Sequence, residues 1–127
     1  MNRQKLSAAM QREMDRFLAR TPKSAALFEN AKKVMPGGVP MSWMSKWPGV
    51  YPTFVAGANG ARFTDVDGNT YVDLCLGDTG SMTGHSPKAT VDAIKAQLDN
   101  GITAMLPTEN ALAVSSDLAL QIGRAHV

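Results

Sequence analysis

Glycine and hydroxyl side chains crowd residues 77–85, which read GDTGSMTGH. A glycine-rich loop between a strand and a helix can wrap its backbone N–H groups around a phosphate, so phosphate binding is the first chemistry to weigh. The segment has neither the GK[ST] ending of a P-loop nor a GxGxxG pattern, and Pro87 stands in the first turn of the helix expected to follow. The pattern therefore argues against a phosphate-cradling loop.

Three other groups in this region could take part in chemistry. His85 is a candidate acid or base, but no carboxylate or second histidine stands at a spacing that would orient it, which favours a hydrogen-bonding turn residue. Cys75 has no second cysteine and no basic neighbour, so we expect a buried thiol in a reducing cytosol. Segment 65–69, DVDGN, has its glycine two positions too early for a calcium loop and lacks the closing glutamate. It predicts a hairpin turn, and we expect no metal site.

Aromatic and sulfur side chains gather in segment 39–52, VPMSWMSKWPGVYP. Proline and glycine interrupt it, so we expect no regular structure there. Loops normally face water and are polar. An apolar loop must cover its own core, a partner subunit or a ligand pocket, and the sequence leaves all three open.

The elements that would position these residues begin with three short strands. Residues 53–56, 61–64 and 71–76 are rich in the β-branched and aromatic residues that favour a pleated surface. Segment 57–60 separates the first two, and the Asp-Gly of segment 67–69 is typical of a tight hairpin turn. The pattern predicts an antiparallel three-stranded meander.

Two helices should precede the meander. Residues 1–20 show apolar positions at helical spacing with charges on the other face. Thr21 is expected to cap the next helix with Pro22 in its first turn, and this second helix should continue until Pro36.

Two more helices should follow the glycine-rich segment. Ser86 and Pro87 are expected to open the first of them, which Asn100 and Gly101 end by a left-handed turn. Thr108 is the expected cap of the last helix.

Composition limits the partners. The 127 residues are 44% apolar and 19% charged, which is enough for one ordinary domain. Thirteen basic and eleven acidic residues, without a run of one sign, make no electrostatic case for nucleic acid or an anionic membrane. Charges interrupt the N-terminal residues, so we expect neither a signal peptide nor a membrane span and a cytoplasmic location. A mitochondrial presequence is the competing idea, against which Glu13 and Asp15 count.

Four stretches in order carry a family resemblance. They are KKVMPGGV at 32–39, ARFTDVDGNTYVDL at 61–74, GHSP at 84–87 and LPTEN at 106–110. Over about residues 24–121 the chain resembles the N-terminal part of class-III pyridoxal-phosphate-dependent aminotransferases, and within them the glutamate-1-semialdehyde aminomutase-like group.

The resemblance implies an α/β fold of the fold type I pyridoxal-phosphate (PLP) transferases, of which this chain is an N-terminal portion. It also implies a homodimer that acts on small-molecule amine and carbonyl substrates. The Schiff-base lysine would lie beyond this fragment, so we expect the full-length protein to be an aminotransferase and the fragment alone to be inactive.

Three positions depart from the aminomutase pattern. In the loop after PGGV, Met41 stands where the aminomutase has a serine and Met44 where it has an arginine that meets the substrate. Methionine cannot grip a carboxylate as arginine does. Asp78 stands where the aminomutase has a tryptophan beside the cofactor. These departures favour an amino-acid or amine transaminase, with the aminomutase proper as the alternative.

The resemblance and the apolar loop together define the candidate site residues, none of which is expected to be catalytic. The substrate-pocket candidates are Met41, Ser42, Trp43, Met44, Trp47, Asp78 and Thr79. The candidates for the cofactor or dimer interface are Gly80, Pro107 and Thr108.

The expected domain organisation follows the same resemblance. Residues 1–20 form an N-terminal helix, 21–86 the N-terminal part of a small domain with the meander, and 87–121 a helical lead-in to the large domain. The letters IGRAHV at 122–127 match one reading frame of an adapter used in short-read DNA libraries, so we interpret them as a non-native tail. A small non-catalytic domain whose Trp and Met loop binds a protein partner is the alternative of another class.

Overall fold

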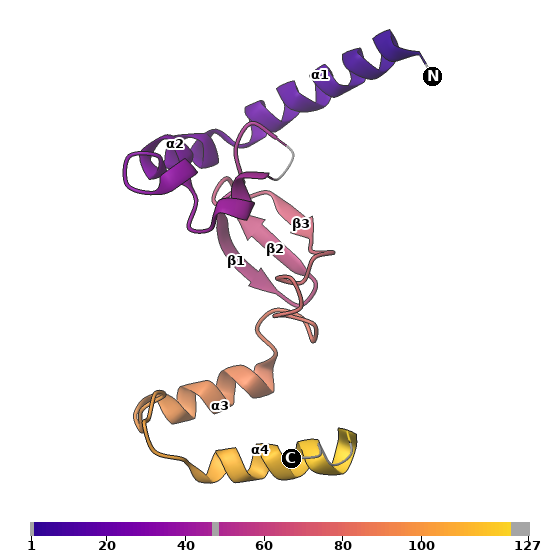
Figure 1. The fold of residues 1–127 in the computed structure, drawn as a ribbon. Helices are drawn as coiled ribbons and strands as arrows, with labels where there is room; N and C mark the ends of the chain where they lie inside the picture. Colours follow the sequence, from indigo (N-terminus) through magenta and orange to yellow (C-terminus); the bar gives the residue numbers. More distant parts are fainter. Residues whose placement is uncertain (1, 47–48, 123–127) are drawn as a thin grey trace. The chain divides into compact units, whose positions relative to one another are not determined.

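The computed structural model describes residues 2–46 and 49–122 and is shown in Figure 1. The chain divides into two units, Met1–Pro87 and Lys88–Val127. Among the described residues, the first unit holds two α-helices, two short 3₁₀ helices and the sheet, and the second holds two α-helices. Trp47, His126 and most of the expected tail lie outside the described residues.

Two helices open the first unit: α1 (Arg3–Arg20) and α2 (Pro22–Ala31). Both were expected, but the Thr21 hydroxyl does not cap α2, because it donates to the Phe17 carbonyl oxygen at 2.7 Å. The α2 helix also ends at Ala31, short of Pro36. Met35, directly before that proline, is extended, as the clash with a proline ring requires.

The aromatic loop is more ordered than its prolines and glycines predicted. A short 3₁₀ helix, η2 (Ser42–Lys46), lies within segment 39–52, and another, η1 (Pro36–Gly38), lies directly before it. The expectation of no regular structure was therefore wrong. Single 3₁₀ turns tolerate these residues because they need only i to i+3 hydrogen bonds.

The sheet is the predicted antiparallel meander, in the order β1-β2-β3. Its strands are β1 (Val55–Asn59), β2 (Arg62–Asp65) and β3 (Thr70–Val72). The first turn lies later than expected, since β1 pairs through to Asn59 opposite Arg62. The register between the two strands shifts once, between Val55 and Gly57.

The third strand is shorter than predicted. It ends at Val72 because the Asp73 carboxylate accepts the N–H groups of Cys75 and Leu76, both at 2.9 Å, and so turns the chain. Cys75 consequently lies exposed in this turn. The expectation of a buried thiol was wrong.

A buried polar junction joins the two helices to the hairpin turn of β2 and β3. Asp65 is 1% exposed and accepts hydrogen bonds from the backbone of Asn69 at 2.8 Å and the hydroxyl of Tyr71 at 2.9 Å. Asn69 also donates to the Arg20 carbonyl oxygen at 2.9 Å. The turn thus holds the end of α1 by specific contacts.

Asp67 caps α2 from the hairpin. Its carboxylate accepts the backbone N–H groups of Lys23 at 2.7 Å and Ser24 at 3.0 Å, and the Ser24 hydroxyl at 2.9 Å. These N–H groups have no partner within the first turn of a helix, and the helix dipole favours a negative charge there. The residue that satisfies the start of α2 is therefore 43 positions away from Ser24 in sequence.

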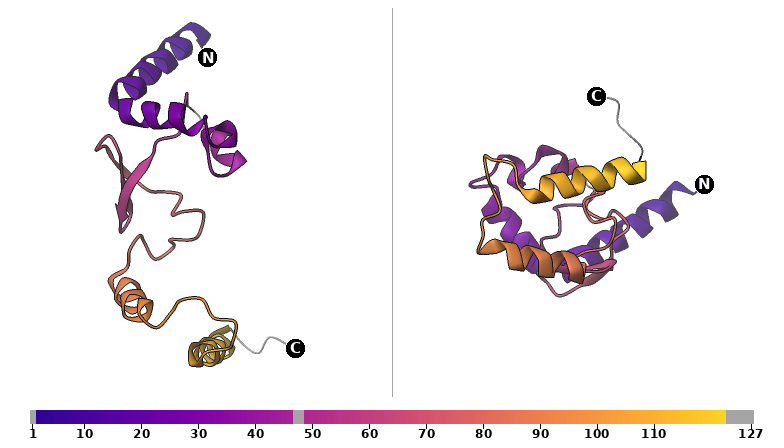
Figure 2. Two further views of the ribbon diagram at one scale, coloured as in Figure 1. Left: turned by 90° about the vertical axis from the view of Figure 1, so that its left-hand side faces the viewer. Right: turned by 90° about the horizontal axis from the view of Figure 1, so that it is seen from below.

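The second unit contains α3 (Lys88–Leu98) and α4 (Glu109–Ile122), both visible in the two views of Figure 2. Gly101 ends the α3 region with a φ of +83°, as predicted. Ser86 does not act as the expected cap, because its hydroxyl donates to the Ala58 carbonyl oxygen at 3.4 Å. Within the described residues, no helix combines the length and apolar character that crossing a bilayer requires.

Candidate functional site

An apolar cavity of about 700 Å³ lies in the first unit. Its described lining comes from the end of α1, the loop around η1 and η2, and the sheet, and includes Phe17, Val39, Trp43, Met44, Phe63 and Val72. Tyr51 also lines it and packs on Phe17, with ring centroids 5.1 Å apart. A cavity of this size and character suits an aromatic or aliphatic ligand group.

The loop residues predicted for the pocket are divided by the structure. Trp43 and Met44 line the cavity, and Met44 is half-buried. Met41 and Ser42 are exposed and are not part of its described lining. Trp47 lies outside the described residues.

The candidate residues of the glycine-rich segment are not part of the described cavity lining. Asp78, Thr79 and Gly80 are all exposed. Asp78 and Thr79 have φ angles of +52° and +77°, a conformation that L-residues rarely adopt. A role for the three in the pocket stays a prediction.

Pro107 and Thr108 belong to the second unit. They line a separate hollow of about 440 Å³ together with Ile94, Ile102 and Leu106. The cofactor or interface role predicted for these two residues stays a prediction.

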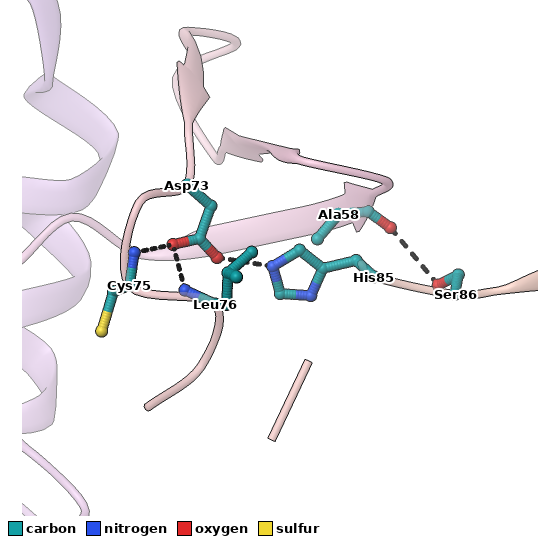
Figure 3. A network of polar contacts seen from close by, with 6 residues as sticks. All are labelled: Ala58, Asp73, Cys75, Leu76, His85 and Ser86. Atoms are coloured by element: carbon teal, nitrogen blue, oxygen red, sulfur yellow. Dashed lines mark hydrogen bonds and ion pairs between the residues drawn. The ribbon is translucent and has the colours of Figure 1, made fainter. Parts of the chain in front are cut away.

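His85 has the orienting carboxylate that sequence spacing did not indicate. Its Nε2 lies 2.6 Å from Oδ2 of Asp73, and Figure 3 shows the ring aimed at that oxygen. The two side chains are 19% and 11% exposed. The statement that no carboxylate could orient His85 was therefore wrong, because the chain folds back across the intervening loop. The sequence signal that was available is an aspartate in YVDL at 71–74 followed by a histidine in GHSP at 84–87.

Hydrogen bonds favour the charged form of the Asp73 and Asp65 carboxylates. The hydrogen bond from His85, followed by that from the Leu76 backbone, lowers the pKa of Asp73 below 3.8. Burial alone would raise the pKa of Asp65, but hydrogen bonds from Asn69, Tyr71 and Asp67 outweigh it and lower that pKa too. Among the described residues, no cluster of His, Cys, Asp or Glu has the arrangement of a metal site.

Solved structures of known enzymes share this fold. A glutamate-1-semialdehyde aminomutase from Pseudomonas aeruginosa PAO1 superposes with a TM-score of 0.91 and 40% identity, over 99% of this chain and 28% of that one. A β-phenylalanine aminotransferase from Variovorax paradoxus has a TM-score of 0.72 and 28% identity, over 86% of this chain and 25% of that one. Two further similar structures are complexes with PMP and with PLP.

Curated relatives point to the same group of proteins. The glutamate-1-semialdehyde 2,1-aminomutase of Methanosarcina acetivorans is 37% identical over 97 residues, which is 76% of this chain and 22% of that protein. That of Methanocaldococcus jannaschii is 36% identical over 107 residues, 83% of this chain and 24% of that protein. This chain thus spans less than a quarter of either relative. No family model matches it.

Proposed function

Because this chain belongs to the glutamate-1-semialdehyde aminomutase-like class-III PLP-dependent aminotransferases and forms an N-terminal portion of their fold, we propose that it walls the substrate side of a transaminase. The complete protein would move an amino group between an amino acid or amine and a keto acid or aldehyde. The carrying observation is the apolar cavity, with Trp43 and Met44 in its lining, in a chain that superposes over 99% of its length on an aminomutase.

The cavity does not itself fit the cofactor. Its described lining contains no lysine, arginine or histidine to hold the PLP phosphate. In the complete protein PLP would supply an electron sink for amino-group transfer, and we assign its lysine and most of its phosphate contacts to residues beyond this chain. The 127-residue chain alone should therefore show no transaminase activity.

The residues of the cavity support a substrate with an apolar substituent. Met44 offers no charge to a carboxylate, whereas arginine would grip one with two hydrogen bonds. Phe17, Tyr51 and Phe63 add aromatic surface around the same space. We therefore propose an aromatic or aliphatic amine, or an amino acid with such a side chain, as the donor.

The aminomutase reaction is the second candidate, favoured by the names of the relatives. The two candidates differ in whether a second polar group of the substrate must be bound in this cavity. Homodimer formation, with Pro107 and Thr108 near the interface, is part of either proposal.

A Met44→Arg variant of the complete protein tests the apolar pocket, and the substrate range of the wild-type protein separates the two candidates. We expect kcat/KM for an arylalkyl amine to fall about tenfold, because a cation replaces apolar surface in the cavity wall and one unfavourable group is worth about 1–3 kcal/mol in such a pocket. The matched control is Val34→Arg, which places the same charge on an exposed residue outside the described lining. The assay follows the loss of the PLP absorption band on adding donor. Wild-type protein that turns over only glutamate 1-semialdehyde would reject the transaminase proposal in favour of the aminomutase.

A further inference from the structure

Both ends of loop 74–84 are anchored on the turn between β1 and β2. At the first end the Asp73 N–H donates to the Ala61 carbonyl oxygen at 2.9 Å. At the other end His85 and Gly60 exchange two backbone hydrogen bonds, of 2.8 and 2.9 Å. The loop therefore leaves and re-enters the sheet at neighbouring positions.

The Asp73–His85 contact joins the two anchors. The Oδ2 of Asp73 meets the imidazole at 2.6 Å, while its Oδ1 accepts the N–H groups of Cys75 and Leu76 (Figure 3). One carboxylate thus turns the chain into the loop and also holds the residue at which the loop ends. A charge-assisted bond between two mostly buried groups is stronger than a neutral one.

Inside the loop the backbone is held in an uncommon conformation. Leu76, Asp78 and Thr79 all have left-handed φ angles, between +52° and +77°. Backbone bonds from Ser81 N to the Leu76 oxygen and from Gly84 N to the Ser81 oxygen, both 2.8 Å, fold the loop on itself. Residues keep such angles only where their surroundings determine them.

The two ends of the loop and the β1–β2 turn that anchors them form a neck. Gly84 lies in this neck and has little room for a side chain. Its φ is +90°, and a Cβ there would lie 3.3 Å from the backbone of Gly60. The loop path is thus fixed from both sides of the neck.

We propose that Asp73 and His85 are a positioning pair that closes the neck of loop 74–84 and sets where Leu74 and Cys75, which line the apolar cavity, lie toward the substrate of the proposed transaminase. This inference rests on the proposed function for the role of the loop. The pair itself does not touch the reacting atoms in this assignment. It acts through the loop.

The test compares His85→Phe, which keeps a ring but has no nitrogen, with His85→Gln, which keeps a donor for Asp73. Both are made in the complete protein, with Asp92→Asn as control because Asp92 forms an exposed ion pair with Lys88 on α3. Hydrogen exchange of peptide 74–84 should be about tenfold faster in His85→Phe and near wild type in His85→Gln and the control, since the free energy of local opening sets the rate. The strand peptide 62–72, which contains none of the residues that anchor the loop, should be unchanged.

Kinetics test the role of the loop. In His85→Phe we expect KM for the amine donor to rise about fivefold with kcat changed less than twofold, as for a lost binding interaction. Unchanged loop exchange, or equal acceleration in the strands, would overturn the pair. Faster loop exchange with unchanged KM would overturn the placement of the loop at the substrate. Should His85→Phe not fold, His85→Ala replaces it in both measurements. Wild-type protein that never consumes the PLP band with any amine would refute the proposed function separately, because the exchange measurement does not depend on turnover.

Discussion

The two units of this chain are held by different kinds of contact. In residues 1–87 the most deeply buried side chains are polar: Thr21, Ser24 and Asp65. They sit where the helices meet the hairpin turn. In the second unit residues 92–121 are all exposed, including the large apolar side chains of Ile102, Leu106 and Leu120. An amphipathic pattern is enough to specify a helix, whereas a fixed arrangement of elements requires contacts between them.

Changes of pH should alter the stability of the first unit through its polar junction, and this is the largest effect that we expect. The pKa values of Asp65 and Asp67 lie below 3.8 in the folded chain, so they contribute stability above that value and lose it as pH falls through the lowered pKa. Burial and the bond to Asp65 raise the pKa of Tyr71 above 10.0, so its contribution is lost as pH rises through the raised value. The urea midpoint of unfolding, measured over a pH series, should fall both at low pH and at high pH. A flat acid limb down to pH values well below 3.8 would contradict this.

Asp65→Ala should give the largest effect of a single substitution. It leaves the N–H of Asn69 and the hydroxyl of Tyr71 without their acceptor, and an unsatisfied buried group is worth about 1–3 kcal/mol. We expect about 3 kcal/mol of destabilisation in urea denaturation. The control is Asp117→Ala on exposed α4, for which a change within about 0.5 kcal/mol is expected. Equal effects at the two sites would remove the distinction between the units.

Gly38→Ala and Gly101→Ala compare two left-handed glycines. Their φ angles are +72° and +83°, but a Cβ on Gly38 would lie 2.7 Å from the Phe28 ring, whereas one on Gly101 meets nothing within 4 Å. We expect about 1 kcal/mol for Gly101→Ala from backbone strain alone, and about 2 kcal/mol for Gly38→Ala, where overpacking adds to it. Thermal unfolding measures both. A smaller effect at Gly38 would show that the Phe28 ring moves aside freely.

Ser24→Ala and Ser116→Ala compare two helical serines and should give the smallest difference. The buried Ser24 hydroxyl donates to Asp67 at 2.9 Å and accepts the Phe54 N–H at 3.2 Å, so its loss should destabilise by about 1 kcal/mol. The Ser116 hydroxyl donates to the Leu112 carbonyl oxygen of its own helix. Alanine at this position should therefore be neutral or slightly stabilising. The urea midpoints of the two variants should therefore move apart. Parallel shifts would contradict this account of Ser24.

The elements of the fold were largely predictable because their signals are local. The Asp-Gly turn, the alternating strands, Pro22 at the start of α2 and Gly101 after α3 each act through residues a few positions away. The errors lay where a distant group intervened. Thr21 turns to Phe17 and Asp67 supplies the cap, while Asp73 ends β3 early and leaves Cys75 exposed.

The candidate site was predicted only in part for the same reason. Apolar composition identified Trp43 and Met44 as wall residues, and both line the cavity. Composition could not indicate that Phe17 and Phe63 also line this cavity. These two residues belong to a helix and a strand that are distant in sequence from the loop of Trp43 and Met44. Composition also could not show that Met44 lines the cavity and Met41 does not. The path of η2 decides which of these two side chains turns inward.

The residues alone determined the helices, the meander and the family resemblance, because propensity, turn chemistry and ordered short motifs are properties of neighbouring positions. The tertiary structure decided that His85 meets Asp73, that Asp67 caps a helix from a hairpin, and which apolar side chains enclose one cavity. Those pairings depend on the path by which the chain returns to itself, and sequence separation does not encode that path.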